Sequence, residues 1–294
     1  SFALLLTFMK QRKQIDADKL ELKHLNREVV LDFLLWLEQE YNNSISTRNQ
    51  RYAAIRSFCK YLQYEEPMRM GEWQNIRAIK MKKSINKTID YLSVDGVKLL
   101  LAQIPDNNRN SRRDLAMLAL LYDSGARVQE LVDLTPSCIR FDIPYNIRLT
   151  GKGNKQRIVP LQKEQVKLLE QYIEDYNLNC PEKASCPLFF NRVGDKLTSA
   201  GVTYILKKYA NAARLTNPDL FPCIISPHSL RHSKAMHLLQ SGINLIYIRD
   251  FLGHKSIQTT EIYARADSKQ KREALETVYI DVIPEKNDTR SWEK

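Results

Sequence analysis

Apolar residues recur at three- and four-residue spacing through most of this chain, and that period constrains its fold more than any other feature. One face of a helix carries residues at this spacing, whereas a half-buried strand alternates at every second residue. A polar break at 42–47, which contains Ser44, Ser46 and Thr47, marks the N-cap of the next helix. We interpret residues 1–66 as a helical domain that continues upstream of residue 1. The period is clearest at Val29, Val30, Phe33, Leu34, Trp36 and Leu37, and again at Tyr52, Ile55, Phe58, Cys59 and Leu62.

A second and larger domain is predicted over residues 91–266, after a linker over 67–90 that is rich in basic residues. Ser93 caps the first helix of this domain, and another helix covers about 112–122. Residues 145–160 alternate as two short strands around a glycine-rich turn, which predicts a hairpin. The sequence therefore predicts a mainly α fold of two domains, with one small antiparallel β-sheet in the second.

The formal net charge is +11 and the pI is about 9.3, which favours a polyanionic partner. Two stretches, 73–89 and 143–163, contain basic residues and no acid. Phosphate-contacting surfaces have this composition, although a solvated linker and a solvated hairpin have it too. The candidate DNA-binding residues are Arg77, Lys80, Lys82, Lys83 and Lys87 in the first stretch, and Arg148, Lys155 and Arg157 in the second.

Metal, redox and membrane roles find little support in the sequence. The five cysteines lack zinc-ligand spacing, and reduced thiols of a cytosolic protein are the simplest account. His228, His232 and His237 lie close together, but no Asp or Glu falls between residues 227 and 237. No apolar run approaches the length of a membrane span. We therefore expect no metal, no cofactor and no membrane partner.

Two clusters place basic groups at the starts of helices. Arg127 follows a glycine break, so it lies where free backbone N–H groups also favour an anion. Glu130 is three residues further along the same helix face and can hold the guanidinium. His228 and Arg231, just after Pro227, also project from one face of a first helical turn. Taken alone, an Arg–Glu pair on a helix is more often a surface ion pair than a catalytic one.

Two further clusters lie on turns. Lys152 occupies the predicted hairpin turn between two glycines, which permit a close approach to a ligand. Gly253 is expected to end a helix and to leave His254 on a turn, with Ser256 capping the next helix. Tyr263 would lie at the far end of that short helix. Such a turn, or one tyrosine among fourteen, is weak evidence by itself.

Taken together, these clusters resemble the tyrosine recombinase (phage integrase) family in identity, order and spacing. The resemblance covers about 91–264, and residues 1–63 resemble the family's helical core-binding domain more loosely. Val-Gln stands where Ile-Ser is common after Arg127, and Lys255 follows His254, but neither change touches a candidate catalytic group. The motifs that carry the resemblance are R-x-x-E-L, T-G-K-G-N-K, H-S-L-R-H, L-G-H and T-T-x-I-Y.

This resemblance implies a phosphoryl transfer that needs neither metal nor ATP. Tyr263 would attack a phosphate of double-stranded DNA, form a 3′-phosphotyrosyl link and release a 5′-hydroxyl. Phosphate diesters repel nucleophiles, and a phenol is mostly protonated at neutral pH, so fixed cations are needed. By the same resemblance, Arg127, Arg231 and His254 would contact the non-bridging oxygens, Glu130 would support Arg127, His228 would assist proton transfer at the nucleophile, and Lys152 would protonate the leaving oxygen.

The resemblance also implies a homo-tetramer on DNA, a cytoplasmic and nucleoid-associated location, and a role in integrating or transposing a mobile element. Residues 267–294 are expected to form a helix and a polar tail. Their apolar stripe packs either within its own domain or on a neighbouring protomer. The stripe consists of Leu275, Val278, Tyr279, Val282 and Ile283.

Three other functions are weighed against recombination. A type IB topoisomerase uses the same chemistry, but the helical first domain and the L-G-H motif favour a recombinase. A non-catalytic DNA-binding protein on this scaffold would be expected to have lost a catalytic position, and all six are present. A metal-dependent nuclease would need a carboxylate cluster, which the motifs do not contain.

Overall fold

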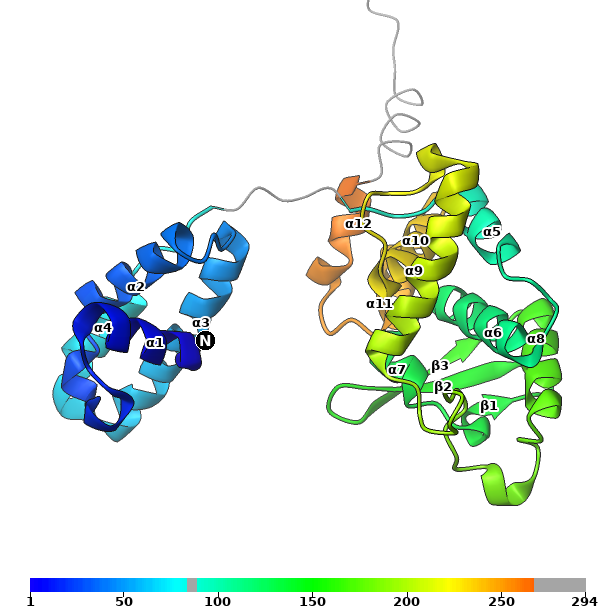
Figure 1. Ribbon diagram of the computed structural model, residues 1–294, viewed down its shortest axis with the longest axis horizontal. Coiled ribbons are helices and arrows are strands. Elements are labelled where there is room, and N and C mark those ends of the chain that lie inside the picture. The colour runs from blue at the N-terminus through cyan, green and yellow to red at the C-terminus, as the bar shows by residue number, and fades with distance from the viewer. Residues whose placement is uncertain (84–88, 267–294) are drawn as a thin grey trace, which may run out of the picture. The chain divides into compact units, whose positions relative to one another are not determined.

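The computed structural model describes residues 1–83 and 89–266, and it separates the chain into two compact units, 1–87 and 88–294 (Figure 1). Both units are mainly helical, as the apolar period predicts. Among the described residues, no helix is long and apolar enough to cross a membrane.

Unit 1 is a small bundle with an aromatic core. Phe8 packs edge to face on Phe33 and at a tilt on Trp36, and Phe33 stacks on Trp36, with ring centroids 5.5–6.1 Å apart. Ser44, within the predicted polar break, accepts a hydrogen bond from the backbone N–H of Thr47 and is the N-cap of the third helix. The helices are α1 (Phe2–Lys13), α2 (Arg27–Gln39), α3 (Ile45–Glu65) and α4 (Met70–Arg77).

The predicted linker over 67–90 is too long, because its first half is folded into unit 1. Helix α4 buries Trp73 and Ile76 completely in the core of that unit. The buried hydroxyl of Tyr52 donates hydrogen bonds to the carbonyls of Ile76 and Ile79, each at 2.8 Å. Apolar side chains within a basic stretch therefore fix its structure, and the charge pattern alone conceals them.

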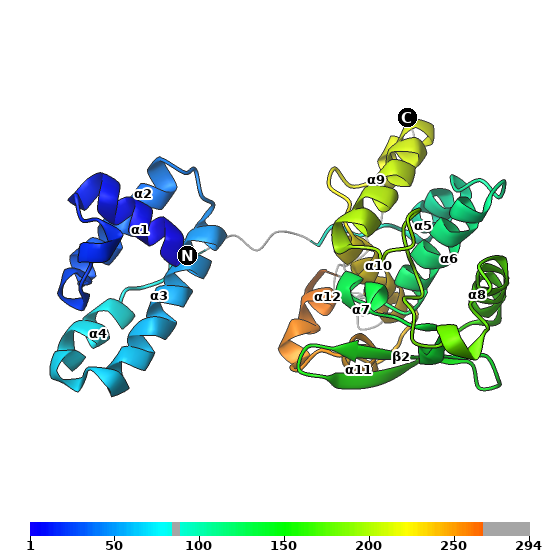
Figure 2. The ribbon, with the colours of Figure 1, turned by 60° about the horizontal axis from the view of Figure 1, so that its bottom comes forward.

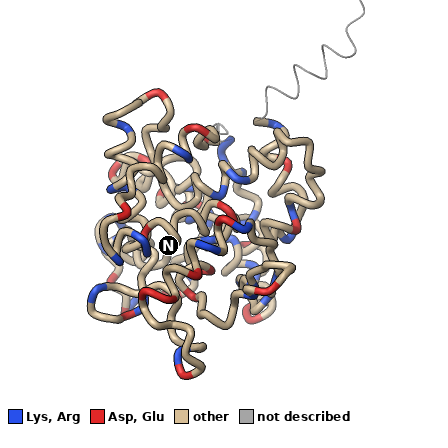
Figure 3. The backbone as a smooth tube through the Cα atoms, turned by 90° about the vertical axis from the view of Figure 1, so that its right-hand side faces the viewer, with Lys and Arg blue, Asp and Glu red and all other residues tan. Residues whose placement is uncertain are grey.

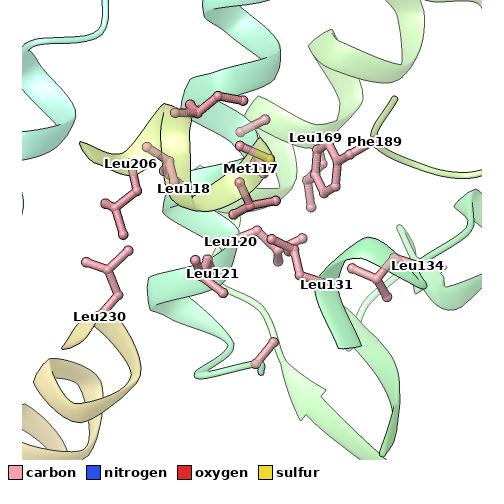
Figure 4. Close-up of a cluster of buried hydrophobic side chains, with 14 of the residues drawn as sticks. Met117, Leu118, Leu120, Leu121, Leu131, Leu134, Leu169, Phe189, Leu206 and Leu230 are labelled. Carbon is pink, nitrogen blue, oxygen red and sulfur yellow. The ribbon is translucent and has the colours of Figure 1, made fainter. Parts of the chain in front are cut away.

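Unit 2 is built around helix α6 (Arg109–Asp123), whose apolar side chains lie at the centre of the large core in Figure 4. Met117, Leu120 and Leu121 are fully buried there. The other α-helices described in this unit are α5 (Val94–Ala102), α7 (Val128–Val132), α8 (Lys163–Asp175), α9 (Ser199–Thr216), α10 (Pro227–Gln240), α11 (Leu245–Leu252) and α12 (Glu261–Ala266). Helices α5, α8 and α10 pack on α6, and Figures 1 and 2 show α11 and α12 farther from it, beyond α10.

The predicted hairpin is confirmed, and a third short strand joins it. The antiparallel sheet has the order β1 (Ile139–Arg140), β2 (Asn146–Gly151) and β3 (Lys155–Pro160). In the register, Leu149 of β2 lies opposite Arg157 of β3, and Gly151 lies opposite Lys155. Ile147, Leu149 and Val159 are buried on the core face. The hairpin therefore extends its turn beyond the packed part of the sheet.

A second, smaller core holds the last three helices together. Met236 of α10 and Ile248 and Leu252 of α11 are buried in it with Tyr263 of α12. Ile89 and Tyr91, at the start of unit 2, pack against the same cluster. Helix α10 also places Leu230 in the large core, so it connects the two clusters.

Candidate active site

The first catalytic candidate, Arg127, is the N-cap residue of helix α7, as the glycine break predicts. Gly125 adopts a left-handed conformation with φ of 56°, and a Cβ there would lie 2.9 Å from the ring of Phe251. The backbone N–H of Arg127 donates to Glu130 at 2.8 Å, and its guanidinium donates to the same carboxylate at 2.7 Å. The predicted pairing is therefore present, and it fixes both the backbone and the guanidinium of Arg127.

Glu130 carries a second arginine, which the sequence interpretation assigned to DNA. Arg157 donates two hydrogen bonds to the two oxygens of Glu130, each at 2.8 Å, and a third to the carbonyl of Phe251 at 2.9 Å. Its side chain is mostly buried. Arg157 is thus held by Glu130 and Phe251, a role that the sequence interpretation did not foresee, and its contact with DNA stays a prediction.

Glu130 itself is only 4% exposed. Burial alone would raise the pKa of this carboxyl, but the hydrogen bonds and charges of Arg157 and Arg127 lower it to about 2. Glu130 is therefore ionised at any physiological pH. One buried anion holds two guanidinium groups in place, which leaves the assembly with a net positive charge.

The β2–β3 turn carries Lys152 at its exposed tip. Gly153 and Asn154 turn the chain with φ of 76° and 56°. Lys152 and Lys155 line an open cleft of about 710 Å³ together with Arg127, Arg157 and His254. The turn thus brings a lysine to the cleft that contains the other basic groups, as its glycines suggested. Arg148 is exposed on the strand.

Arg231 lies in the first turns of α10 and is only 3% exposed. Its guanidinium donates to the carbonyl of Gly125 and, at 2.6 Å, to that of Leu252. Burial, together with the nearby charges of Arg127 and Arg157, lowers its pKa to about 10. Arg231 therefore remains charged at neutral pH and is fixed by two backbone carbonyls from separate helix ends.

His254 follows helix α11, which ends at Gly253 in the predicted left-handed conformation, with φ of 66°. Its Nδ1 lies 2.9 Å from the hydroxyl of Thr260, which is a partner the sequence did not indicate. Burial and the charges of Arg231 and Arg127 lower the pKa of His254 to about 4. The carbonyl of Gly253 also accepts a hydrogen bond from Arg127 at 3.3 Å.

Tyr263 lies on α12 and is only 1% exposed. Ser256 caps a short 3-10 turn (Ile257–Thr259), so Tyr263 belongs to a separate helix and not to the far end of the predicted one. Burial raises the pKa of its phenol, and the charges of Arg231 and Arg127 lower it in opposition. Two of the anion-binding candidates therefore lie close enough to act on this phenol.

The histidine that touches Tyr263 is His232, which the sequence interpretation considered only as a possible metal ligand. Its Nδ1 lies 2.9 Å from the phenol oxygen. His228, the predicted partner in proton transfer, is exposed one turn earlier on α10, and its ring centroid lies 6.3 Å from that of His232. The spacing of four residues on one helix was the signal that could have identified His232.

The candidate DNA-binding residues of the first basic stretch belong to unit 1 and do not behave alike. Arg77 is hydrogen-bonded to Gln63, and Lys82 forms an ion pair with Glu38 at 2.7 Å. Lys80 and Lys83 are exposed, and Lys87 lies outside the described residues. Basic and acidic residues are interleaved over the backbone (Figure 3), so net charge alone does not locate a binding surface.

The assembled groups suit the transfer of a phosphoryl group. Arg127, Lys152 and His254 line one cleft, the charges of Arg127 and Arg231 act on the buried phenol, and each of these groups can donate to an anionic oxygen. Within residues 1–83 and 89–266, no three His, Cys, Asp or Glu side chains are grouped as metal ligands would be. The arrangement is a cationic site with one buried nucleophile candidate.

Comparison with known proteins agrees with this chemistry. The phage integrase family model matches residues 90–270. The tyrosine recombinase XerC of Herpetosiphon aurantiacus is 35% identical over 83% of this chain and 77% of its own length, and XerD of Listeria innocua is 36% identical over 81% and 77%. The crystal structure of the XerH site-specific recombinase bound to palindromic difH substrate shares the fold, with a TM-score of 0.70 at 24% identity over 88% of this chain and 73% of that one. This chain therefore belongs to the phage integrase family, and it is an enzyme of the tyrosine recombinase class.

Proposed function

We propose that this chain cuts and rejoins double-stranded DNA at specific sites by linking a DNA phosphate covalently to Tyr263. The observation that carries the proposal is the environment of that phenol. It is buried, it is hydrogen-bonded to a histidine, and its pKa responds to Arg127 and Arg231. Burial raises the pKa of this phenol, and fixed cations whose charges oppose that rise are an arrangement that suits a nucleophile.

Charge stabilisation is the first part of the mechanism. Attack on a phosphate diester spreads negative charge over the non-bridging oxygens, and prepositioned donors stabilise that charge without reorganising. Arg231 is held by two backbone carbonyls and Arg127 by Glu130 and Gly253, so both are prepositioned. His254, neutral because its pKa is about 4, would donate an N–H to the same phosphate.

Proton delivery to the leaving group is the second part. When the bond between phosphorus and the 5′ oxygen breaks, the departing oxygen needs a proton. Lys152 is exposed at the hairpin turn and lines the same cleft as Arg127 and His254. We assign it as the donor. His228, which the resemblance predicts to assist proton transfer at the nucleophile, is exposed near the start of α10.

Membership of the family supports a proposal for the partner and the assembly. XerH, the structural neighbour, is described as bound to its difH substrate. We infer that this chain likewise acts on paired DNA sites as a homo-tetramer at the nucleoid, in the integration or transposition of a mobile element. The segment 267–294, proposed to dock on a neighbouring protomer, lies outside the described residues.

Covalent capture tests this function with no DNA sequence chosen in advance. Sheared DNA from the strain that encodes the chain is incubated with the protein, and DNA that remains attached under denaturing conditions is sequenced. We expect attachment through 3′ phosphates at a few specific sequences, and none with Tyr263→Phe. Tyr122→Phe is the matched control, because Tyr122 also contacts a histidine of α10, His237, at 2.8 Å. An adduct that survives Tyr263→Phe, or attachment through 5′ phosphates, would contradict the proposal.

A second assay separates a recombinase from a topoisomerase. Plasmids that carry two copies of a captured sequence should yield recombinant products, whereas plasmids without a copy should not be relaxed. Efficient relaxation of plasmids that contain no captured sequence would favour the topoisomerase instead.

A further inference from the structure

The hydroxyl of Tyr263 is held by a residue to which neither the motif nor the proposed mechanism gives a role. His232 Nδ1 and the phenol oxygen are 2.9 Å apart, and the two rings lie 5.6 Å apart at an angle of 58°. The two residues come from α10 and α12, which pack in the smaller core of unit 2. The contact is therefore fixed by tertiary packing and not by a local turn.

The direction of this hydrogen bond decides its chemical meaning. Burial, with the charges of His228 and Arg231, lowers the pKa of His232 to about 4, so its ring is neutral at pH 7. A neutral imidazole has one donor nitrogen and one acceptor nitrogen. The phenol is the more acidic partner and therefore the better donor, so the favoured tautomer carries its proton on Nε2 and accepts at Nδ1.

We propose that His232 is the general base that takes the proton of Tyr263 during strand cleavage and returns it during rejoining. This inference rests on the proposed function and names the proton acceptor that the function requires. As the phenol oxygen bonds to phosphorus, its proton moves to Nδ1 of His232, the bond from phosphorus to the 5′ oxygen breaks, and that oxygen receives a proton from Lys152. Rejoining reverses both transfers, so protons and charge balance over a full cycle.

The surroundings explain why the base sits at 232 and not at 228. His228 is exposed, and the structure shows no hydrogen bond from it to Tyr263 among the described residues. The charged or titratable groups near the His232–Tyr263 pair are His228 and Arg231 from α10, Arg127 from the start of α7, and His254 from the turn after α11. The arginine charges disfavour a second cation, so a proton taken by His232 is readily given back.

The first test needs no DNA. Nitrogen NMR of the full chain, labelled at histidine and assigned by comparison with His232→Asn, reports which ring nitrogen carries the proton. We expect His232 at pH 7 to be neutral, with the proton on Nε2 and a bare Nδ1. A proton on Nδ1 would make His232 a donor to the phenol oxygen, and this result would overturn the proposal.

The second test measures cleavage of a captured DNA site by single-turnover kinetics. The substrate carries sulfur in place of the leaving 5′ oxygen, so that proton donation by Lys152 no longer affects the rate. His232→Asn keeps an acceptor near the position of Nδ1 but cannot take up a proton, and we expect it to cleave about 100-fold more slowly at pH 7. Its rate should rise with pH as the phenol ionises by itself, whereas the wild-type rate should stay level.

Matched variants distinguish a base from a packing residue. His237→Asn removes another α10 histidine that contacts a tyrosine hydroxyl, at 2.8 Å, and should keep the wild-type rate and pH profile. Placing difluorotyrosine, which loses its proton at lower pH, at position 263 should restore much of the rate of His232→Asn and change the wild type little. His232→Gln repeats the test if the Asn variant folds poorly.

Two outcomes would overturn the role of His232. The first is a wild-type cleavage rate and pH profile in His232→Asn. The second is that His228→Asn, and not His232→Asn, cleaves slowly, speeds up with pH and is rescued by difluorotyrosine at position 263. Failure of the proposed function looks different, because the wild-type protein would then form no adduct that depends on Tyr263. In that case the tautomer measurement still decides whether His232 accepts the hydrogen bond.

Discussion

Replacing Glu130 with glutamine should destabilise unit 2 and loosen both arginines that depend on this carboxylate. The side chain is buried and accepts two hydrogen bonds from Arg157 and two from Arg127. Glutamine has nearly the same shape, but its amide has no charge and presents N–H groups toward one guanidinium. The change therefore leaves two cations with their anion removed, which is the costly way to break a buried pair.

The magnitude follows from the pKa of Glu130. Its fall from an ordinary 4.5 to about 2 corresponds to about 3 kcal/mol of folding free energy, at about 1.4 kcal/mol for each pH unit. Because the folded-state pKa is the lower of the two, this stabilisation is complete above about pH 4.5 and is lost as the pH falls toward about 2. Glutamine does not titrate. The difference between the two proteins should therefore be constant near neutral pH and should shrink in acid.

Urea unfolding of the full chain can follow the two units separately. Trp36 and Trp73 are buried in unit 1, so in a Trp292→Phe background tryptophan fluorescence reports that unit, while far-ultraviolet circular dichroism reports both units. We expect Glu130→Gln to lower the urea midpoint of unit 2, which circular dichroism reports, and to leave the fluorescence transition of unit 1 unchanged. Asp133→Asn is the control, because Asp133 lies beside α7 in an exposed pair with Lys196 and should cost at most about 1 kcal/mol. Equal effects of the two changes, or a Glu130→Gln deficit that persists unchanged at pH 3, would refute the reasoning.

Three further outcomes are expected. Lys152→Ala should cleave ordinary DNA poorly and recover on a substrate with a sulfur leaving group, whereas equal defects on both would remove Lys152 as the proton donor. Neutralising Arg148 and Lys155 should lower the slope of log affinity against log salt by about 0.9 for each phosphate that the protein no longer neutralises. Arg157→Gln should chiefly destabilise unit 2. A change of salt slope in Arg157→Gln with unit 2 as stable as before, and none on neutralising Arg148 and Lys155, would contradict the geometry. Cleavage should tolerate EDTA, and a loss that magnesium restores would show that a metal takes part.

The parts of the site that the sequence predicted are those that depend on neighbours in the chain. Arg127 and Glu130 lie three residues apart, so any helix beginning there brings them together. Gly253 ends α11, and the glycine-rich segment around Lys152 forms a hairpin turn, because short-range backbone preferences determine both. The mainly helical fold with one small antiparallel sheet follows from the two apolar periods for the same reason.

The parts of the site that the sequence did not predict depend on tertiary packing. Arg157 is two residues before the buried Val159 on the same strand, so the period of two places it on the core face, but only the fold shows that Glu130 lies there. His232 and Tyr263 are thirty-one residues apart and meet only because α12 packs on α10. The linker was misjudged because Trp73 and Ile76 bury a stretch whose charges suggested solvent.

Helix α10 connects the proposed nucleophile, Tyr263, with one of the cations proposed to stabilise its attack, Arg231. Arg231 and His232 are consecutive on that helix, and they serve different partners. Arg231 donates to the carbonyls of Gly125 and Leu252 at the edge of the anion site, whereas His232 meets Tyr263 inside the smaller core. A shift of α10 would move both groups together and preserve their separation. A shift of α12 alone would instead withdraw the phenol from His232, so we expect variants that loosen the packing of α12 on α10 to lower the rate of any reaction at Tyr263.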